Sequence, residues 1–181
     1  GEALGVAHAE GRAYVADGSR GLSIYDLADP AAPLLLGTLG FTGTCRGVAI
    51  AGPYAYVAAD SRGLLIVDVA DPHAPVLRSR FDTPGRAVGV VVEGRYAYVA
   101  DLNQGVRIID VSRPEAPAQV ATFGTPGAAS GVALSGTRLL VADGFSGLLE
   151  YDVSDPASPV LRDINLTIKP ATWMTVFAQG Q

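Results

Sequence analysis

Four residue types are almost missing from this sequence. It contains one Cys, one Met, one Trp and one Lys, and the last three stand together in the final stretch "KPATWMTVFAQGQ", residues 169–181. Because Cys45 has no partner, no disulfide forms within the chain. A lone thiol in such a sequence is typically a small buried side chain, so we expect Cys45 in the core and not as a nucleophile.

Other absences exclude whole classes of protein. No apolar run approaches the roughly 18 residues of a membrane helix, so no membrane span is expected. The net charge is −5 and there is no basic block, which argues against a nucleic-acid partner. An apolar fraction of 49% against 17% charged residues excludes a disordered chain and indicates one domain with a sizeable core.

What the sequence does have is a strict repeat. The segment "YVADGSRGLSIYDLADPAAP", residues 14–33, returns 42 residues later as "YVAADSRGLLIVDVADPHAP", then as "YVADLNQGVRIIDVSRPEAP" and "LVADGFSGLLEYDVSDPASP". The period holds without insertions. It defines four units, 1–42, 43–84, 85–126 and 127–168, followed by the tail 169–181.

Each unit contains four short strand patterns. In the third unit these are 89–94, 96–101, 105–111 and 118–123, rich in β-branched and aromatic residues and separated by Gly, Asn and Pro turns. No stretch keeps a helical period. Four strands in about 42 residues is the size of one propeller blade. The sequence therefore predicts an all-β fold, a β-propeller-like array of four four-stranded blades.

The motif "GLLIVDVADPHAPVL", preceded by "YAYVAD", resembles the LVIVD repeat of bacterial and archaeal surface and secreted proteins. The resemblance covers residues 1–168 and implies a β-propeller-like fold. It implies no catalytic residues, because that family has no shared catalytic site. One departure stands out: Glu150 places a charge where the other units have an Ile.

The number of blades does not decide whether the array is a closed ring or an open arc. Four blades can close alone, since propellers have about four to eight, but four is the tightest case. The alternative is an open arc, cut from a longer ring or completed by another chain. In either arrangement the last sheet edge has to be covered.

The recurrent Asp residues suggest turns and not metal ligands. Each ends a strand just before a Pro-rich turn, where a carboxylate accepts backbone N–H groups. Calcium loops need several oxygen ligands within one loop, and no loop here has that spacing. We therefore expect no metal and no cofactor. The four structural turn residues are Asp26, Asp68, Asp110 and Asp152.

No catalytic set is visible either. His8 lies in a first strand and is expected to be partly buried, whereas His73 lies in an exposed Pro turn, and neither is near a nucleophile motif. Phosphate loops and zinc spacings are absent. The sequence predicts that the protein is not an enzyme.

A better candidate for function is one face of the array. In a propeller, the turns after the second strands and the crossings between blades emerge on the same face. Their residues vary here while the frames around them do not, and variable loops on a fixed scaffold are typical binding sites. The candidate binding face comprises Arg20, Arg46, Arg62, Arg86, Asn103, Gln104, Ser130 and Phe145.

The tail aligns with the repeat in an informative way. A shift of 42 residues places "AASGVAL", 128–134, on "PATWMTV", 170–176, so the tail stands where a fifth first strand would begin. Three arrangements are open: a closing strand in cis, the stump of another repeat, or a strand added to a neighbouring molecule. The candidate assembly strand comprises Thr172, Trp173, Met174, Thr175, Val176 and Phe177.

These patterns predict a non-enzymatic repeat scaffold, extracellular or at the cell surface, whose partners are other proteins or copies of itself. Gly1 follows no visible signal peptide, as in a processed exported protein or a cut chain. Two alternatives remain. One is an enzyme or a propeller that binds a small ligand, such as a carbohydrate, on the loop face. The other is a fragment of a longer surface protein.

Overall fold

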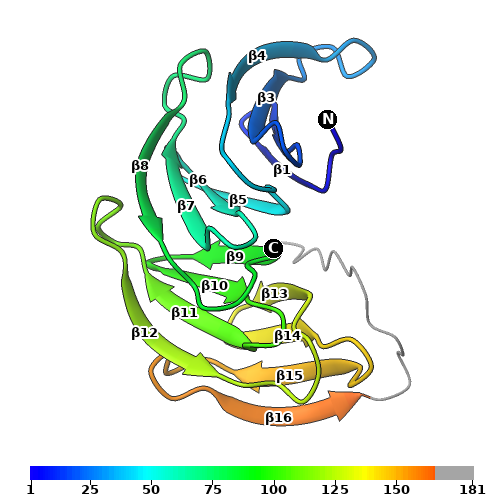
Figure 1. The fold of residues 1–181 in the computed structure, drawn as a ribbon, viewed down its shortest axis with the longest axis vertical. Helices are drawn as coiled ribbons and strands as arrows, with labels where there is room; N and C mark the ends of the chain where they lie inside the picture. Colours follow the sequence, from blue (N-terminus) through cyan, green and yellow to red (C-terminus); the bar gives the residue numbers. More distant parts are fainter. Residues whose placement is uncertain (166–181) are drawn as a thin grey trace.

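The computed structural model describes residues 1–165. It confirms the predicted fold class: sixteen strands in these residues form four separate four-stranded antiparallel sheets, one for each repeat (Figure 1). Each sheet is a meander in which consecutive strands are neighbours. Among residues 1–165, no helix has the length and apolarity that crossing a membrane requires.

The strand bounds follow the repeat closely. Blades 1 and 2 consist of β1 (Gly5–Ala9), β2 (Arg12–Ala16), β3 (Leu22–Asp26), β4 (Leu34–Leu39), β5 (Gly47–Ala51), β6 (Tyr54–Ala58), β7 (Leu64–Asp68) and β8 (Val76–Phe81). Blades 3 and 4 consist of β9 (Gly89–Glu93), β10 (Tyr96–Ala100), β11 (Val106–Asp110), β12 (Ala118–Phe123), β13 (Gly131–Ser135), β14 (Arg138–Ala142), β15 (Leu148–Asp152) and β16 (Val160–Asn165).

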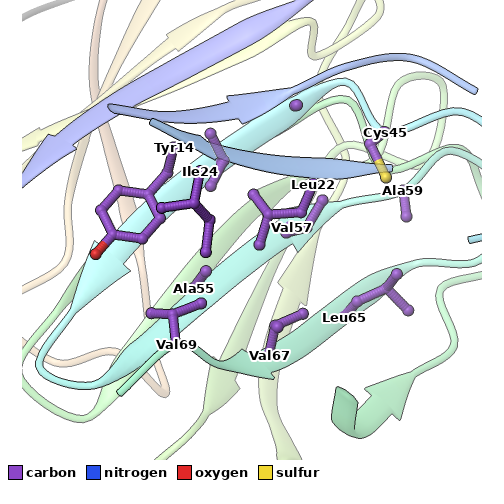
Figure 2. Close-up of a cluster of buried hydrophobic side chains, with 12 residues drawn as sticks. Tyr14, Leu22, Ile24, Cys45, Ala55, Val57, Ala59, Leu65, Val67 and Val69 are labelled. Atoms are coloured by element: carbon purple, nitrogen blue, oxygen red, sulfur yellow. The ribbon is translucent and has the colours of Figure 1, made fainter. Parts of the chain in front are cut away.

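The two middle strands of blades 2 and 3 are buried on both sides, because each of these blades packs between two neighbours. We call the side toward the preceding blade the leading face and the side toward the following blade the trailing face. Successive strand residues point to opposite faces. Tyr14 and Ile24 on the trailing face of blade 1 thus pack against Val57 and Val67 on the leading face of blade 2 (Figure 2).

Three such clusters form the core, one between each pair of consecutive blades. They are built from equivalent positions: Tyr56 and Ile66 meet Val99 and Ile109 between blades 2 and 3. The third cluster adds an aromatic pair between blades 3 and 4, in which the rings of Phe123 and Tyr151 lie 4.3 Å apart. The core is therefore a stack of layers and not one central mass.

The array is an open arc and not a closed four-bladed ring. Among residues 1–165, no buried cluster joins blade 4 to blade 1. Figure 1 shows the four sheets following one another around a curve, with the first and last blades at its two ends. The sequence allowed either a closed four-bladed ring or an open arc, and the structure is the open arc (Figure 1).

The inner side of the arc is lined by the first strands, which approach one another very closely. β1 contacts β5, β5 contacts β9, and β9 contacts β13. A Cβ atom at Gly5 would lie 2.6 Å from the carbonyl oxygen of Arg46, and one at Gly47 would lie 3.0 Å from that of Val88. A side chain at Gly5 would overlap the next blade, so the close contact there requires glycine.

Candidate functional site

The loops after the second strands are fixed to the following blade by backbone hydrogen bonds. The Asp60 N–H donates to the Ala87 carbonyl at 2.9 Å, and the Ala87 N–H donates back to the Asp60 carbonyl at 3.0 Å. Leu102 and Ala129 form the same pair of bonds, 3.1 Å each, between blades 3 and 4. The loop face is therefore a continuous, pre-formed surface.

A cluster of three charged side chains stands on this face at the junction of blades 2 and 3. Asp60 accepts the Nε–H of Arg46 at 2.7 Å. It also binds Arg86 through two parallel hydrogen bonds, from Nε and Nη2, both 2.6 Å. The Asp60 side chain is only 12% exposed, whereas that of Arg86 is 54% exposed. Two cations thus converge on one carboxylate, which leaves a net positive charge.

The cluster fixes the ionisation of its carboxylate. The hydrogen bonds from Arg86 and then Arg46 lower the pKa of Asp60 from 3.8 to about 2, against the opposing effect of burial. The same contact raises the pKa of Arg86. All three groups are therefore charged at neutral pH, and the guanidinium groups are held in place.

Beside the cluster lies a hollow of about 610 Å³, which we call the loop-face hollow. Arg46 and Arg86 form one side of it, and Leu102 and Phe145 contribute apolar surface. Phe145 is 82% exposed, the most exposed of the large apolar side chains in residues 1–165. The other residues that line the loop-face hollow have small or polar side chains: Val88, Pro126, Gly127, Ala128, Ser130, Gly144 and Ser146.

The structure brings together four of the eight residues of the predicted binding face. Arg46, Arg86, Ser130 and Phe145 line the loop-face hollow. The other four lie outside it. Arg20 lies beside Asp17 on blade 1, and Arg62 donates to the Thr42 hydroxyl at 2.5 Å. Asn103 and Gln104 lie in the blade 3 turn and do not line it.

Sequence reasoning did not place Asp60 or Leu102 on the binding face, and it interpreted Asp60, one place late in its turn, as a structural turn residue. Both stand in the same turn position as Gly18 and Gly144 and have positive φ angles, 53° and 47°. The available signal was that the second repeat reads "YVAAD" where two other repeats read "YVAD", which moves the Asp one place along the turn. That shift carries the carboxylate out of the core and onto the loop face.

The unshifted Asp residues have a structural role in the same loops. Asp101 is fully buried and accepts hydrogen bonds from the Thr83 hydroxyl at 2.7 Å, the Gly85 N–H at 3.1 Å and the Arg107 Nε–H at 2.9 Å. Asp143 likewise accepts the Gly127 N–H at 2.7 Å. These carboxylates tie each loop to the crossing that precedes its blade.

The Asp residues at the ends of the third strands cap the Pro-rich turns. In each repeat the carboxylate accepts the N–H two residues on, at 2.8 or 2.9 Å: Ala28 to Asp26, Ala70 to Asp68, Ser112 to Asp110 and Ser154 to Asp152. Within residues 1–165, no group of three or more His, Cys, Asp and Glu is placed to hold a metal ion.

The remaining candidate reactive groups have simple environments. His8 is exposed, so the prediction that it is partly buried was wrong: its side chain points away from blade 2, on the leading face of blade 1, where no blade covers it within residues 1–165. His73 is exposed in its turn. Cys45 is fully buried between blades 1 and 2, and burial raises the pKa of its thiol to about 11, which keeps it protonated.

The two ends of the arc present faces that no blade covers within residues 1–165. On blade 1, Ala13, Val15, Tyr25 and Leu27 of the leading face are partly exposed and line a hollow of about 450 Å³. Their counterparts in blade 2 are buried, Val57 completely so. On the trailing face of blade 4, Leu140, Leu148 and Glu150 are also partly exposed.

The predicted assembly strand, Thr172 to Phe177, lies outside the described residues. The last described strand, β16, ends at Asn165 on the outer edge of blade 4.

A family model describes the repeat. It is the LVIVD repeat, and it matches residues 1–39, 42–83, 84–125 and 126–167. The protein is thus a propeller-like repeat protein, and it belongs to the LVIVD repeat family, as its sequence indicated. No curated protein matches the chain.

Two solved structures share the fold. The computationally designed Ika8 protein is similar with a TM-score of 0.69 over 86% of this chain, at 5% identity; the match covers 47% of the Ika8 chain, so this chain spans about half of its length. The computationally designed Ika4 protein is similar with a TM-score of 0.66 over 90% of this chain and 91% of its own, also at 5% identity.

Proposed function

We propose that this protein is a non-enzymatic scaffold that binds other proteins, including copies of itself, outside the cell or at its surface. The observation that carries the proposal is that the strands of the four blades repeat one pattern, whereas the loop residues between them differ from blade to blade. Loop residues of blades 2, 3 and 4 line one hollow. Such a surface serves recognition without chemistry.

The loop-face hollow has the composition of a protein-binding site. Exposed aromatic and Arg side chains dominate the energy of protein interfaces. Phe145 supplies the aromatic group. Arg86 is held in place by its two hydrogen bonds to Asp60, and its side chain is still 54% exposed. Because Arg86 is ordered before binding, little conformational entropy is lost when it contacts a partner.

The experiment compares partner capture by the wild type with that by Phe145→Ala and Arg86→Ala. We expect each variant to lose at least tenfold in affinity for the principal bound protein, since interface anchors contribute about 2 kcal/mol or more. Arg113→Ala, on the opposite face, is the matched control. If capture is unchanged in both hollow variants, this face is not the binding site.

Self-association through the tail is a separate part of the proposal. In the first three blades, a loop residue pairs with the entrance of the next blade: Gly18 with Cys45, Asp60 with Ala87, Leu102 with Ala129. The 42-residue period would place the next such pair at Gly144 and Ala171, directly before the assembly strand, and this is why we assign self-association to the tail. We therefore expect Trp173→Ala with Phe177→Ala to lower the mass in solution, and a full-length protein that is already monomeric would end this part of the proposal.

A small ligand is the second candidate for the same face. The hollow of about 610 Å³ is in the range of small-molecule sites, which is roughly 300–1,000 Å³. A thermal-shift screen that includes acidic carbohydrates tests it. A compound that raises the melting temperature of the wild type and not of Arg46→Ala or Arg86→Ala would favour this function over protein binding.

A further inference from the structure

We propose that two copies of this chain close head to tail into one ring, with the blade 4 trailing face of each copy packed on the blade 1 leading face of the other. The proposal rests on the self-association part of the proposed function and adds to it a contact between sheet faces, which the face variants test separately from the tail variant.

The first argument is the repetition of one interface. The chain makes the same face-to-face contact three times, and each time the trailing positions Tyr14, Tyr56 and Tyr98 are buried. The two end faces are the unused halves of that contact. A second copy therefore presents to each end face the same kind of surface that packs on the equivalent face inside the chain. An unrelated protein has no such matching surface.

The second argument concerns the leading face of blade 1, which keeps the apolar character of a covered face. Ala13, Val15 and Leu27 match Ala55, Val57 and Val69, which are buried in blade 2. In the isolated chain this apolar surface forms an open hollow. Contiguous apolar surface of this kind marks an interface.

The third argument is that the trailing side of the unused contact carries a charged replacement. Glu150 stands there where the other blades have Ile, and its charge is already met by two hydrogen bonds from Arg138, 2.8 and 2.7 Å. A contact between separate folded chains is typically more polar than a core, since each surface is also exposed to water.

The fourth argument is the aromatic position at the outer strands. Between blades 3 and 4, Phe123 packs on Tyr151 at 4.3 Å. At the contact between copies, the same positions are Asn165 of one chain and Tyr25 of the other. In the other two contacts within the chain the equivalent pairs are Leu39 with Val67 and Phe81 with Ile109. Only the contact between copies has a polar residue, Asn165, at this position, so we expect it to be weaker than those within the chain.

The head-to-tail contact uses two different surfaces, so it generates either a closed ring or an open chain of molecules. The blades already follow a curve whose two ends are blades 1 and 4 (Figure 1). Two arcs that face each other use all four end faces and leave no apolar face uncovered. We therefore assign the closed pair.

The test measures the mass of the full chain by light scattering over a range of concentrations. The wild type is expected at twice the mass of one chain. Val15→Glu and Leu148→Glu each place a charge in the contact and are expected to weaken association about a hundredfold. Val76→Glu, on the exposed outer strand of blade 2, is the control and stays associated. A monomeric wild type, larger multiples, or association that survives both face variants overturns the proposal.

Mixing the two variants separates head-to-tail from head-to-head packing. A Val15→Glu chain keeps its trailing face and a Leu148→Glu chain keeps its leading face, so the mixture regains one intact contact. We expect the mixture to associate where neither variant does alone. Failure to do so, with both variants folded by circular dichroism, overturns the head-to-tail arrangement.

A gain of affinity tests the assigned register. Asn165→Phe introduces at the contact between copies a ring pair with Tyr25 like that of blades 3 and 4, and is expected to tighten association about threefold to tenfold. Tyr25→Ala in the same chain removes that gain if the two side chains meet. A gain that persists without Tyr25 overturns the register.

Cross-linking gives a direct readout. Within the chain, a Cβ at Gly37 would lie 3.1 Å from the His73 carbonyl oxygen, so these two positions are neighbours across a blade contact. Their counterparts between copies are Asp163 and Ala31, both exposed. Asp163→Cys with Ala31→Cys is expected to form a disulfide-linked pair of chains. Ser79→Cys with Glu115→Cys, the same pair inside the chain, is the control, and a control that closes while the test pair stays reduced overturns the proposal.

Discussion

At the scale of single residues, Asp60 shows how one shifted position changes a surface. Its counterparts in repeats 3 and 4, Asp101 and Asp143, are buried carboxylates that accept hydrogen bonds from the loop backbone. Because Asp60 comes one place later, with a positive φ of 53°, its carboxylate reaches Arg46 and Arg86 from two different blades. A structural residue has thereby become part of a charged surface cluster.

We predict that Asp60→Asn destabilises the protein by about 1–2 kcal/mol at neutral pH, because two Arg side chains lose their shared anion. Asn keeps the size of the side chain and tolerates the positive φ. Urea denaturation measures the effect. Asp82→Asn removes an exposed pair with Arg80 and serves as the control, with an expected change below about 0.5 kcal/mol.

The same carboxylate gives the protein a defined acid dependence. The pKa of Asp60 falls from 3.8 to about 2 on folding, so the stability it contributes is complete above about pH 4. That stability is lost as the pH falls toward 2, where the folded form also takes up the proton. The difference in unfolding free energy between the wild type and Asp60→Asn should therefore shrink over this interval, and a constant difference would contradict the assignment.

At the scale of elements, the turn between the second and third strands is the most tightly constrained part of a blade. Gly105 has a φ of 74°, and a Cβ there would lie 2.1 Å from the carbonyl oxygen of Phe123 on the outer strand. Both the backbone angle and the close approach exclude a side chain. The turn therefore fixes how the outer strand joins the sheet.

Gly105→Ala is expected to destabilise the protein by about 2–4 kcal/mol, since the methyl group overlaps backbone that cannot move alone. Gly94→Ala is the matched control: its φ is 58°, but nothing lies within 4 Å of the added Cβ. It should cost only about 1 kcal/mol, for the strained angle. Equal losses in thermal unfolding would show that the close contact is unimportant.

The elements were predictable because their signals are local. The pattern 96–101 predicted β10, observed as Tyr96–Ala100, and 118–123 predicted β12 with the same bounds. The loop-face cluster was only half predictable. Arg46 and Arg86 were candidates from their positions, but their meeting on Asp60 depends on how adjacent blades are rotated, and no local pattern encodes that rotation.

The environment of His8 was mispredicted for a related reason. Equivalent first-strand positions in the other repeats hold Ile50, Val92 and Leu134, which suggested a partly buried side chain. Those residues have a preceding blade beside them, whereas blade 1 has none in residues 1–165. Repeated positions share a local structure but not the same neighbours.

At the scale of the whole molecule, stability is the sum of three blade contacts, as in other repeat arrays. The ends and the interior therefore respond differently to the same substitution. Val57 is fully buried between blades 1 and 2, and Val15 is its counterpart on the uncovered end.

Val57→Glu is expected to prevent stable folding, because an unpaired carboxylate would be buried in the layer between blades. Val15→Glu is expected to cost less than about 1 kcal/mol in dilute protein, where the end face is open to water. Denaturation curves at low concentration compare the two. A similar loss for both would mean that the blade 1 leading face is covered within a single chain.

The glycines on the inner side of the arc have a geometric consequence. Gly5, Gly47 and Gly89 stand where consecutive first strands touch, at one position per repeat. The separation of the strands at this inner line, relative to the outer strands, sets the bending radius of the array. A larger residue at that one position would straighten the curve, so a family built from this repeat can vary the circumference of its assemblies while every blade stays the same.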